Sequence, residues 1–91
     1  MTMATPDDSL IEYPCDFPVK AMGLAEHDIE TIFMEIARAH FPHQTTFDIK
    51  RMESKAGKYL SITITLNAHN RDQLDATYQA LYDHEKILMT L

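Results

Sequence analysis

Residues 58–67 read Lys-Tyr-Leu-Ser-Ile-Thr-Ile-Thr-Leu-Asn, and this stretch decides the fold. Apolar and polar side chains alternate along it, so that one face of the extended chain is aliphatic: Leu60, Ile62, Ile64 and Leu66. Alternation with period two predicts a β-strand with one buried and one hydrated face, which is typical of an antiparallel sheet. Isoleucine and threonine also favour extended backbone. We therefore expect this strand at the centre of an antiparallel sheet.

Two further strands are predicted upstream of this central strand. Residues 45–53 form one of them, with Phe47 and Ile49 facing inward, and a turn that ends at Gly57 joins it to the central strand. Residues 16–23 form the other, which ends at a glycine.

Two helices are predicted between and after these strands. Residues 26–41 repeat apolar side chains on one helical face, carry acids in the first turns and end before Pro42. Residues 71–83 form the second helix, because Asn70 suits an N-cap and Gln73 stands three residues further on, as in a capping box.

A final strand is predicted over residues 87–91, with Ile87, Met89 and Leu91 facing inward. The order of elements is therefore β-α-β-β-α-β, and right-handed crossovers place the first and third strands in the centre. The sequence thus predicts an α+β, ferredoxin-like sandwich: a four-stranded antiparallel sheet in the order 4-1-3-2 with two helices on one face.

The chain of 91 residues has room for one hydrophobic core. Residues 1–10 are polar and contain Pro6, so we predict a disordered N-terminal tail there and a single domain over residues 11–91. The start of the chain lacks the apolar segment of a secretory signal, and no apolar run has the length of a membrane span. A single cysteine excludes an internal disulfide. These features predict a cytoplasmic protein without a membrane partner.

The chain is acidic, with 14 Asp and Glu against 8 Lys and Arg and a net charge of -6. Phosphate binding requires a basic surface, so this charge disfavours nucleic acid as a partner. RNA-recognition domains share the predicted strand order, but they stack bases on aromatic side chains of the central strands. Here the open face of the central strand offers one aromatic side chain, Tyr59. We therefore expect no nucleic acid partner.

The sequence shows no assembled catalytic set. Cys15 stands beside Asp16, whereas a nucleophilic thiolate needs a nearby base or cation. His40 and His43 have a spacing that metal ligands use, but Pro42 ends the helix between them and no second ligand pair completes a site. We therefore expect no enzymatic activity, no metal and no cofactor.

The turn between the first strand and the first helix is a candidate ligand site, formed by Gly23, Leu24, His27 and Asp28. Glycine permits close approach of a ligand to the backbone, and the N–H groups at a helix N-terminus attract carboxylates. The pattern fits a small anionic ligand, and it fits an ordinary strand-to-helix turn as well.

Half of the basic residues lie in the hairpin between the second and third strands: Lys50, Arg51, Lys55 and Lys58. Glu53 is the only acid among them, so the hairpin 50–58 is a candidate docking surface for an acidic partner. The alternative is a solvated hairpin whose lysines keep an edge strand from pairing with other chains. The hydroxyl-rich open face of the sheet is either simply hydrated or paired with a second copy in a homodimer.

Two stretches resemble the YbeD-like family of small bacterial proteins. Residues 13–23 read Tyr-Pro-Cys-Asp-Phe-Pro-Val-Lys-Ala-Met-Gly, similar to the start of that family. Residues 54–68 resemble its Ser-Lys-Gly strand segment, although Ala56 stands here beside Gly57. The resemblance implies a ferredoxin-like fold similar to the ACT regulatory domains, an unknown function and a loose link to lipoate metabolism.

Two functions follow from these features. The first is a non-catalytic, ACT-like regulatory domain over residues 11–91, which binds a small metabolite (an amino acid or a carboxylate), a partner protein, or both. The alternative is a protein-interaction adaptor without a small ligand, which docks through the hairpin 50–58 or through an edge strand.

Overall fold

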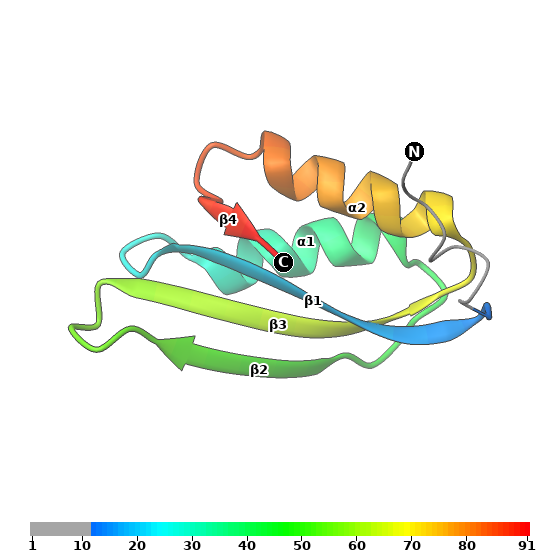
Figure 1. Cartoon of the computed structure of the whole chain (residues 1–91), viewed down its shortest axis with the longest axis horizontal. Helices are drawn as coiled ribbons and strands as arrows, with labels where there is room; N and C mark the ends of the chain where they lie inside the picture. Colours follow the sequence, from blue (N-terminus) through cyan, green and yellow to red (C-terminus); the bar gives the residue numbers. More distant parts are fainter. Residues whose placement is uncertain (1–11) are drawn as a thin grey trace.

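The computed structural model describes residues 12–91, so the tail predicted for residues 1–10 lies outside the described residues. The elements follow in the predicted order: β1 (Cys15–Leu24), α1 (Ile29–His40), β2 (Asp48–Glu53), β3 (Tyr59–Ala68), α2 (Arg71–Asp83) and β4 (Met89–Thr90). The four strands form one antiparallel sheet in the order β2-β3-β1-β4, and both helices lie on one side of it (Figure 1). This order is 4-1-3-2 read from the opposite edge, so the predicted ferredoxin-like fold is confirmed.

The hydrophobic core lies between the sheet and the two helices. The central strands β1 and β3 contribute these fully buried apolar side chains: Val19, Ala21, Ile62, Ile64, Leu66 and Ala68. The helices cover them with Ile29, Phe33 and Ala37 from α1 and with Leu74 and Leu81 from α2. Phe47 and Ile49 pack half-buried against this core, as predicted. The apolar residues that repeat every second position in the strands and those on one face of each helix thus pack together in one layer.

The first helix begins later than predicted. The carboxylate of Asp28 accepts a hydrogen bond from the Thr31 N–H (3.3 Å) and acts as the N-cap, so α1 begins at Ile29 rather than at residue 26. Glu26 consequently lies in the turn before the helix. A short side chain that caps a helix replaces one of its missing backbone partners, which fixes where the helix can start.

The second helix has the predicted bounds and the predicted cap. The side chain of Asn70 accepts from the Gln73 N–H (2.9 Å). The side chain of Gln73 accepts from the His69 N–H (2.8 Å) and donates to the carbonyl oxygen of His40 (2.9 Å). Gln73 therefore ties the start of α2 to the end of α1.

The second strand starts later than the predicted residue 45, because the side chain of Gln44 occupies the edge of β3. Its Nε2 donates to the carbonyl oxygen of Thr65 (3.0 Å), and its Oε1 accepts from the Asn67 N–H (2.8 Å). These bonds take up backbone groups that a longer strand would use, so regular pairing begins only at Asp48.

The inward face predicted for the last strand is wrong beyond Ile87. Ile87 is buried at 8% exposure, but Met89 and Leu91 are 51% and 65% exposed. Ile87 still belongs to the turn that follows α2, where its N–H donates to the carbonyl oxygen of His84 (3.0 Å). The strand begins after this turn and sets Thr90 opposite the buried Ala21. A shift of one residue turns every side chain of a strand to the other face, so Met89 and Leu91 lie on the open face of the sheet.

Candidate functional site

The turn of residues 23–28 is packed where a ligand was expected to approach. Gly23 is buried, and a Cβ atom at this position would overlap the side chain of Ile29 and lie 2.5 Å from the carbonyl oxygen of Lys86. The glycine is therefore required for the contact of β1 with α1 and with the loop before β4. The absence of a side chain at Gly23 is thus needed for packing within the protein.

Backbone N–H groups of the turn already have hydrogen-bond partners within the protein. The Ala25 N–H donates to the carbonyl oxygen of Lys58 (2.8 Å), and the His27 N–H donates to that of Leu24 (3.0 Å). The His27 ring lies with its Nε2 3.9 Å from the carboxylate of Glu26.

An anion that approached the start of α1 would meet the carboxylate of Asp28, which already caps the helix, together with Glu26 and Glu30. Like charges weaken the attraction of a helix N-terminus for a carboxylate. Ligand binding by Gly23, Leu24, His27 and Asp28 stays a prediction, with less support from this geometry than from the sequence.

The basic residues of the hairpin 50–58 do not form one cluster. Arg51 forms a two-pronged ion pair with Glu30 of α1: its Nε donates to Oε1, and its Nη2 donates to Oε2 at 2.7 Å. The hydrogen bond from Arg51 lowers the pKa of the Glu30 carboxyl below its usual value. Arg51 thus holds β2 against α1, on the helix side of the sheet.

The three lysines of the hairpin remain exposed to solvent: Lys50, Lys55 and Lys58. Among residues 12–91, no carboxylate forms an ion pair with any of them. The ammonium of Lys58 lies 5.5 Å from the centroid of the Tyr59 ring, within the range of a cation–π contact. Successive side chains of a strand point to opposite faces, so Lys50 and Arg51 lie on different faces of the sheet. Partner binding through these lysines stays a prediction.

The open face of the sheet carries a feature that the sequence analysis missed. Met22 of β1 stands opposite both Met89 of β4 and Ser61 of β3, and Ser61 stands opposite Met52 of β2. Residues opposite each other in an antiparallel sheet point to the same face. Met22, Met52 and Met89 therefore form a methionine row across the sheet. The alternation of side chains along β1 and β2 could have placed Met22 and Met52 on the open face. Their alignment in one row could not be predicted, because it depends on the pairing of strands that are distant in sequence.

A row of lysines lies next to the methionine row. Lys20 of β1 stands opposite Thr63 of β3, which stands opposite Lys50 of β2. Met52 is 71% exposed. A shallow hollow of about 220 Å³ lies along the methionine row, and its lining carries one lysine and one glutamate: Lys20, Met22, Met52, Glu53, Ser54, Tyr59 and Ser61.

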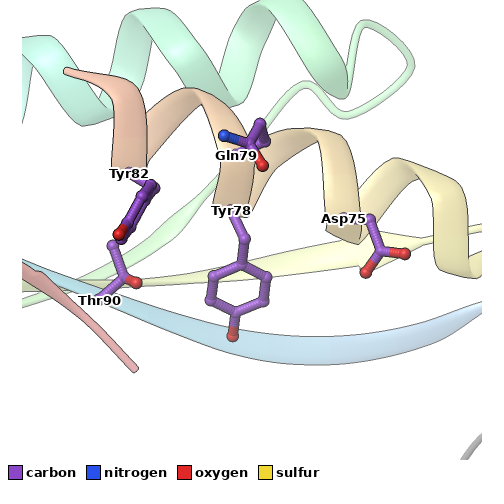
Figure 2. A pocket seen from close by; sticks show the side chains of 5 residues that line it. All are labelled: Asp75, Tyr78, Gln79, Tyr82 and Thr90. Atoms are coloured by element: carbon purple, nitrogen blue, oxygen red, sulfur yellow. The ribbon is translucent and has the colours of Figure 1, made fainter. Parts of the chain in front are cut away.

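A second hollow lies on the other side of the molecule, between α2 and β4 (Figure 2). It has a volume of about 430 Å³ and is lined by Asp75, Tyr78, Gln79, Tyr82 and Thr90. The ring of Tyr78 points from α2 toward the sheet, where its hydroxyl donates to the carbonyl oxygen of Leu91 (3.2 Å). Burial raises the pKa of Tyr78, while Tyr82 is 78% exposed at the rim.

The histidines have structural contacts. His40 Nδ1 lies 2.9 Å from the carbonyl oxygen of Ile36, and the rings of His43 and His69 stack at 3.9 Å between centroids. Within residues 12–91, no three side chains of His, Cys, Asp or Glu are grouped to hold a metal ion. No helix of this described part is long and apolar enough to cross a membrane.

Comparison with known proteins gives consistent matches along the whole chain. A family model described as "Protein of unknown function (DUF493)" matches residues 8–91. A UPF0250 protein of Nitrosomonas europaea is 42% identical over 87 residues, which cover 93% of this chain and 98% of that protein. A UPF0250 protein of Janthinobacterium sp. is 41% identical over 91 residues, which cover all of both chains. The resemblance to the YbeD-like proteins is thereby confirmed.

A solved structure also matches. The solution structure of protein HP0495 from H. pylori has a TM-score of 0.73 over 99% of this chain and 98% of that one, at 20% sequence identity. At this identity the likeness supports the fold alone.

Proposed function

The chain belongs to the DUF493 family, whose function is unknown, and we propose that it acts in the cytoplasm as a non-catalytic interaction domain that docks on an acidic surface of a partner protein. One observation supports this proposal most strongly: Lys50, Lys55 and Lys58 are exposed on one hairpin and form no ion pair with a carboxylate of residues 12–91, on a chain with a net charge of -6. The net charge of the chain disfavours approach of an acidic partner, and a local group of exposed lysines offsets this repulsion, so the patch favours both an acidic partner and one orientation of it.

The regulatory alternative is a domain that binds an amino acid or another carboxylate at Gly23, Leu24, His27 and Asp28. It has less support, because Ile29 and Lys86 occupy the space beside Gly23 and the carboxylate of Asp28 already caps α1. An amide NMR titration with amino acids, lipoate and common carboxylates would test it. Saturable shifts centred on residues 23–28 would favour the metabolite sensor over the interaction domain.

The interaction domain is tested by affinity capture of its partner from the bacterium that encodes it. The tagged wild-type chain is compared with a hairpin variant that carries Lys50→Glu and Lys55→Glu. The matched control carries Arg38→Glu and Lys86→Glu, two exposed cations on α1 and in the loop before β4. Both variants have the same net charge, so a difference between them reports position.

We expect the hairpin variant to capture about one tenth or less of the amount of partner that the wild type captures, because two charges are reversed at one interface. The control variant should retain it. An amide NMR spectrum of each variant confirms that the fold is unchanged. Equal capture by wild type, hairpin variant and control would exclude the hairpin as the docking surface.

A further inference from the structure

We propose that the open face of the sheet binds an amphipathic α-helix of the partner protein, with the apolar stripe of that helix on the methionine row and its carboxylates on Lys20 and Lys50. The proposal rests on the proposed function and specifies which structure of the acidic partner is recognised. It concerns the face of the sheet opposite to α1 and α2 (Figure 1).

The methionine row has the dimensions and chemistry of a helix-binding surface. Met52 and Met89 lie on the two edge strands, three strand spacings apart, or about 14 Å. A helix that lies along the row rises about 1.5 Å per residue, so about nine residues, or two and a half turns, cover this distance. Methionine is unbranched and polarisable, and it adapts its shape to a partner more readily than other apolar residues.

One more exposed apolar side chain, Leu91, adjoins the methionine row at the β4 edge. The backbones of Leu91 and Lys20 exchange two hydrogen bonds, at 3.1 and 2.9 Å, which sets the exposed side chain of Leu91 on the open face next to Met89. Large apolar side chains that are exposed together mark interaction surfaces. A helix laid here would turn the two-layer fold into three layers, with the sheet covered on both faces.

Charge on the open face determines the kind of helix. Lys20 and Lys50 form the row next to the methionines, whereas Asp48, two residues before Lys50, and Asp16, four residues before Lys20, lie on the side of this row away from the methionines. A helix whose apolar stripe is flanked by Asp or Glu places its carboxylates at the lysine row. A helix flanked by Lys or Arg is repelled there, so the face discriminates between the two.

A second copy of the chain fits this surface less well. If two copies stacked with their strands parallel, each lysine row would face the other lysine row. If one copy were turned end over end about the methionine row, Lys20 would face Leu24 and Lys50 would face the position of Ser54, and neither of these side chains is charged. Neither of these two arrangements, which bring the methionine rows of both copies together, gives the lysines a carboxylate, and an acidic helix does.

The test uses a defined probe: a synthetic 18-residue amphipathic peptide with a leucine stripe flanked by glutamates. It is titrated into the full-length, isotope-labelled chain and followed by amide NMR. The control peptide has lysine at every glutamate position. We expect saturable shifts at Lys20, Met22, Met52 and Met89 with the acidic peptide, and binding weaker by about tenfold or more with the basic one.

Two matched variants locate the surface. Met52→Asp with Met89→Asp removes exposed apolar side chains from the row, and Tyr82→Asp with Leu88→Asp removes two exposed apolar side chains at the end of α2 and just before β4. The first should weaken both peptide binding and partner capture by about tenfold or more, and the second should leave both unchanged.

Several results would overturn the proposal. These are absence of saturable shifts, equal binding of the two peptides, equal loss in both variants, or a methionine variant that still captures the partner. If charge reversal in the hairpin abolishes capture while the methionine variant retains it, the helix site is wrong and the interaction domain stands. If neither variant affects capture, both proposals fail.

Discussion

At the residue scale, the pair of Arg51 and Glu30 shows how one side chain can be assigned two different roles. The sequence groups Arg51 with three lysines as a docking residue. The structure commits it to Glu30 on α1 through two hydrogen bonds, so it contributes to the fold rather than to the free charge of the hairpin. Neutralising it to test partner binding would therefore also disturb the contact between β2 and α1.

This pair predicts a specific dependence of stability on pH. The hydrogen bond from Arg51 lowers the pKa of Glu30 in the folded state from its ordinary value of 4.5. A lowered folded-state pKa stabilises the protein fully above the unfolded-state value, and this stabilisation is lost as the pH falls through the lowered pKa. Glu30→Gln should therefore lower the free energy of unfolding at neutral pH and have little effect at about pH 2.

Urea denaturation at both pH values measures this difference. Glu35→Gln, an exposed position on the same helix, is the control. An effect of Glu30→Gln that is as large at low pH as at neutral pH would show that the ion pair is not its source.

Gly23 gives a second prediction at the residue scale. A methyl group here meets the Ile29 side chain and the Lys86 carbonyl oxygen, and backbone cannot yield as a flexible side chain can. Gly23→Ala should cost about 1–3 kcal/mol in the free energy of unfolding, as overpacking does. Chemical denaturation measures the loss.

The other glycine serves as a contrast. Gly57 has open space around its Cβ position but a φ of 72°, so Gly57→Ala should cost about 1–2 kcal/mol through backbone strain alone. A compensating second substitution, Ile29→Val, should relieve part of the cost at Gly23 and none at Gly57. If Gly23→Ala is as stable as wild type, the turn has room for a ligand after all.

At the element scale, the register of the last strand yields a prediction about its two kinds of apolar residue. Ile87→Ala should cost about 2–4 kcal/mol in the free energy of unfolding, because it leaves a cavity in the core. Met89→Ala should change it by less than about 0.5 kcal/mol, because its side chain is half exposed on the open face. Thermal or urea denaturation of the two variants separates these values. Similar costs for both would support the inward register predicted from the alternation.

The elements differ in how far local sequence determined them. The bounds of α2 were predictable because its cap lies in its own sequence, at Asn70 and Gln73. The start of β2 was not, because it depends on the side chain of Gln44 reaching β3. The register of β4 was not predictable either. Ile87 stays in the turn after α2, where its N–H donates to the carbonyl oxygen of His84, and the Leu88 N–H donates to the carbonyl oxygen of Met22 on the distant strand β1.

At the scale of the whole molecule, the topology followed from the order of elements and the handedness of crossovers. The candidate surfaces could be predicted from the sequence only in part. Lys50, Lys55 and Lys58 were visible as a charge cluster, but the methionine row requires the pairing of β2, β3, β1 and β4, which no local pattern contains. Surfaces that several strands build jointly become apparent only after folding.

The opposed charges on the open face have a kinetic consequence. Because Lys20 and Lys50 lie beside the methionine row and Asp16 and Asp48 lie on the side away from it, the face carries an electric dipole along its strands. An acidic helix that diffuses toward it is turned into alignment before any contact forms. Added salt should then slow the encounter more than it shortens the lifetime of the complex, because that lifetime depends on the packing of the methionines.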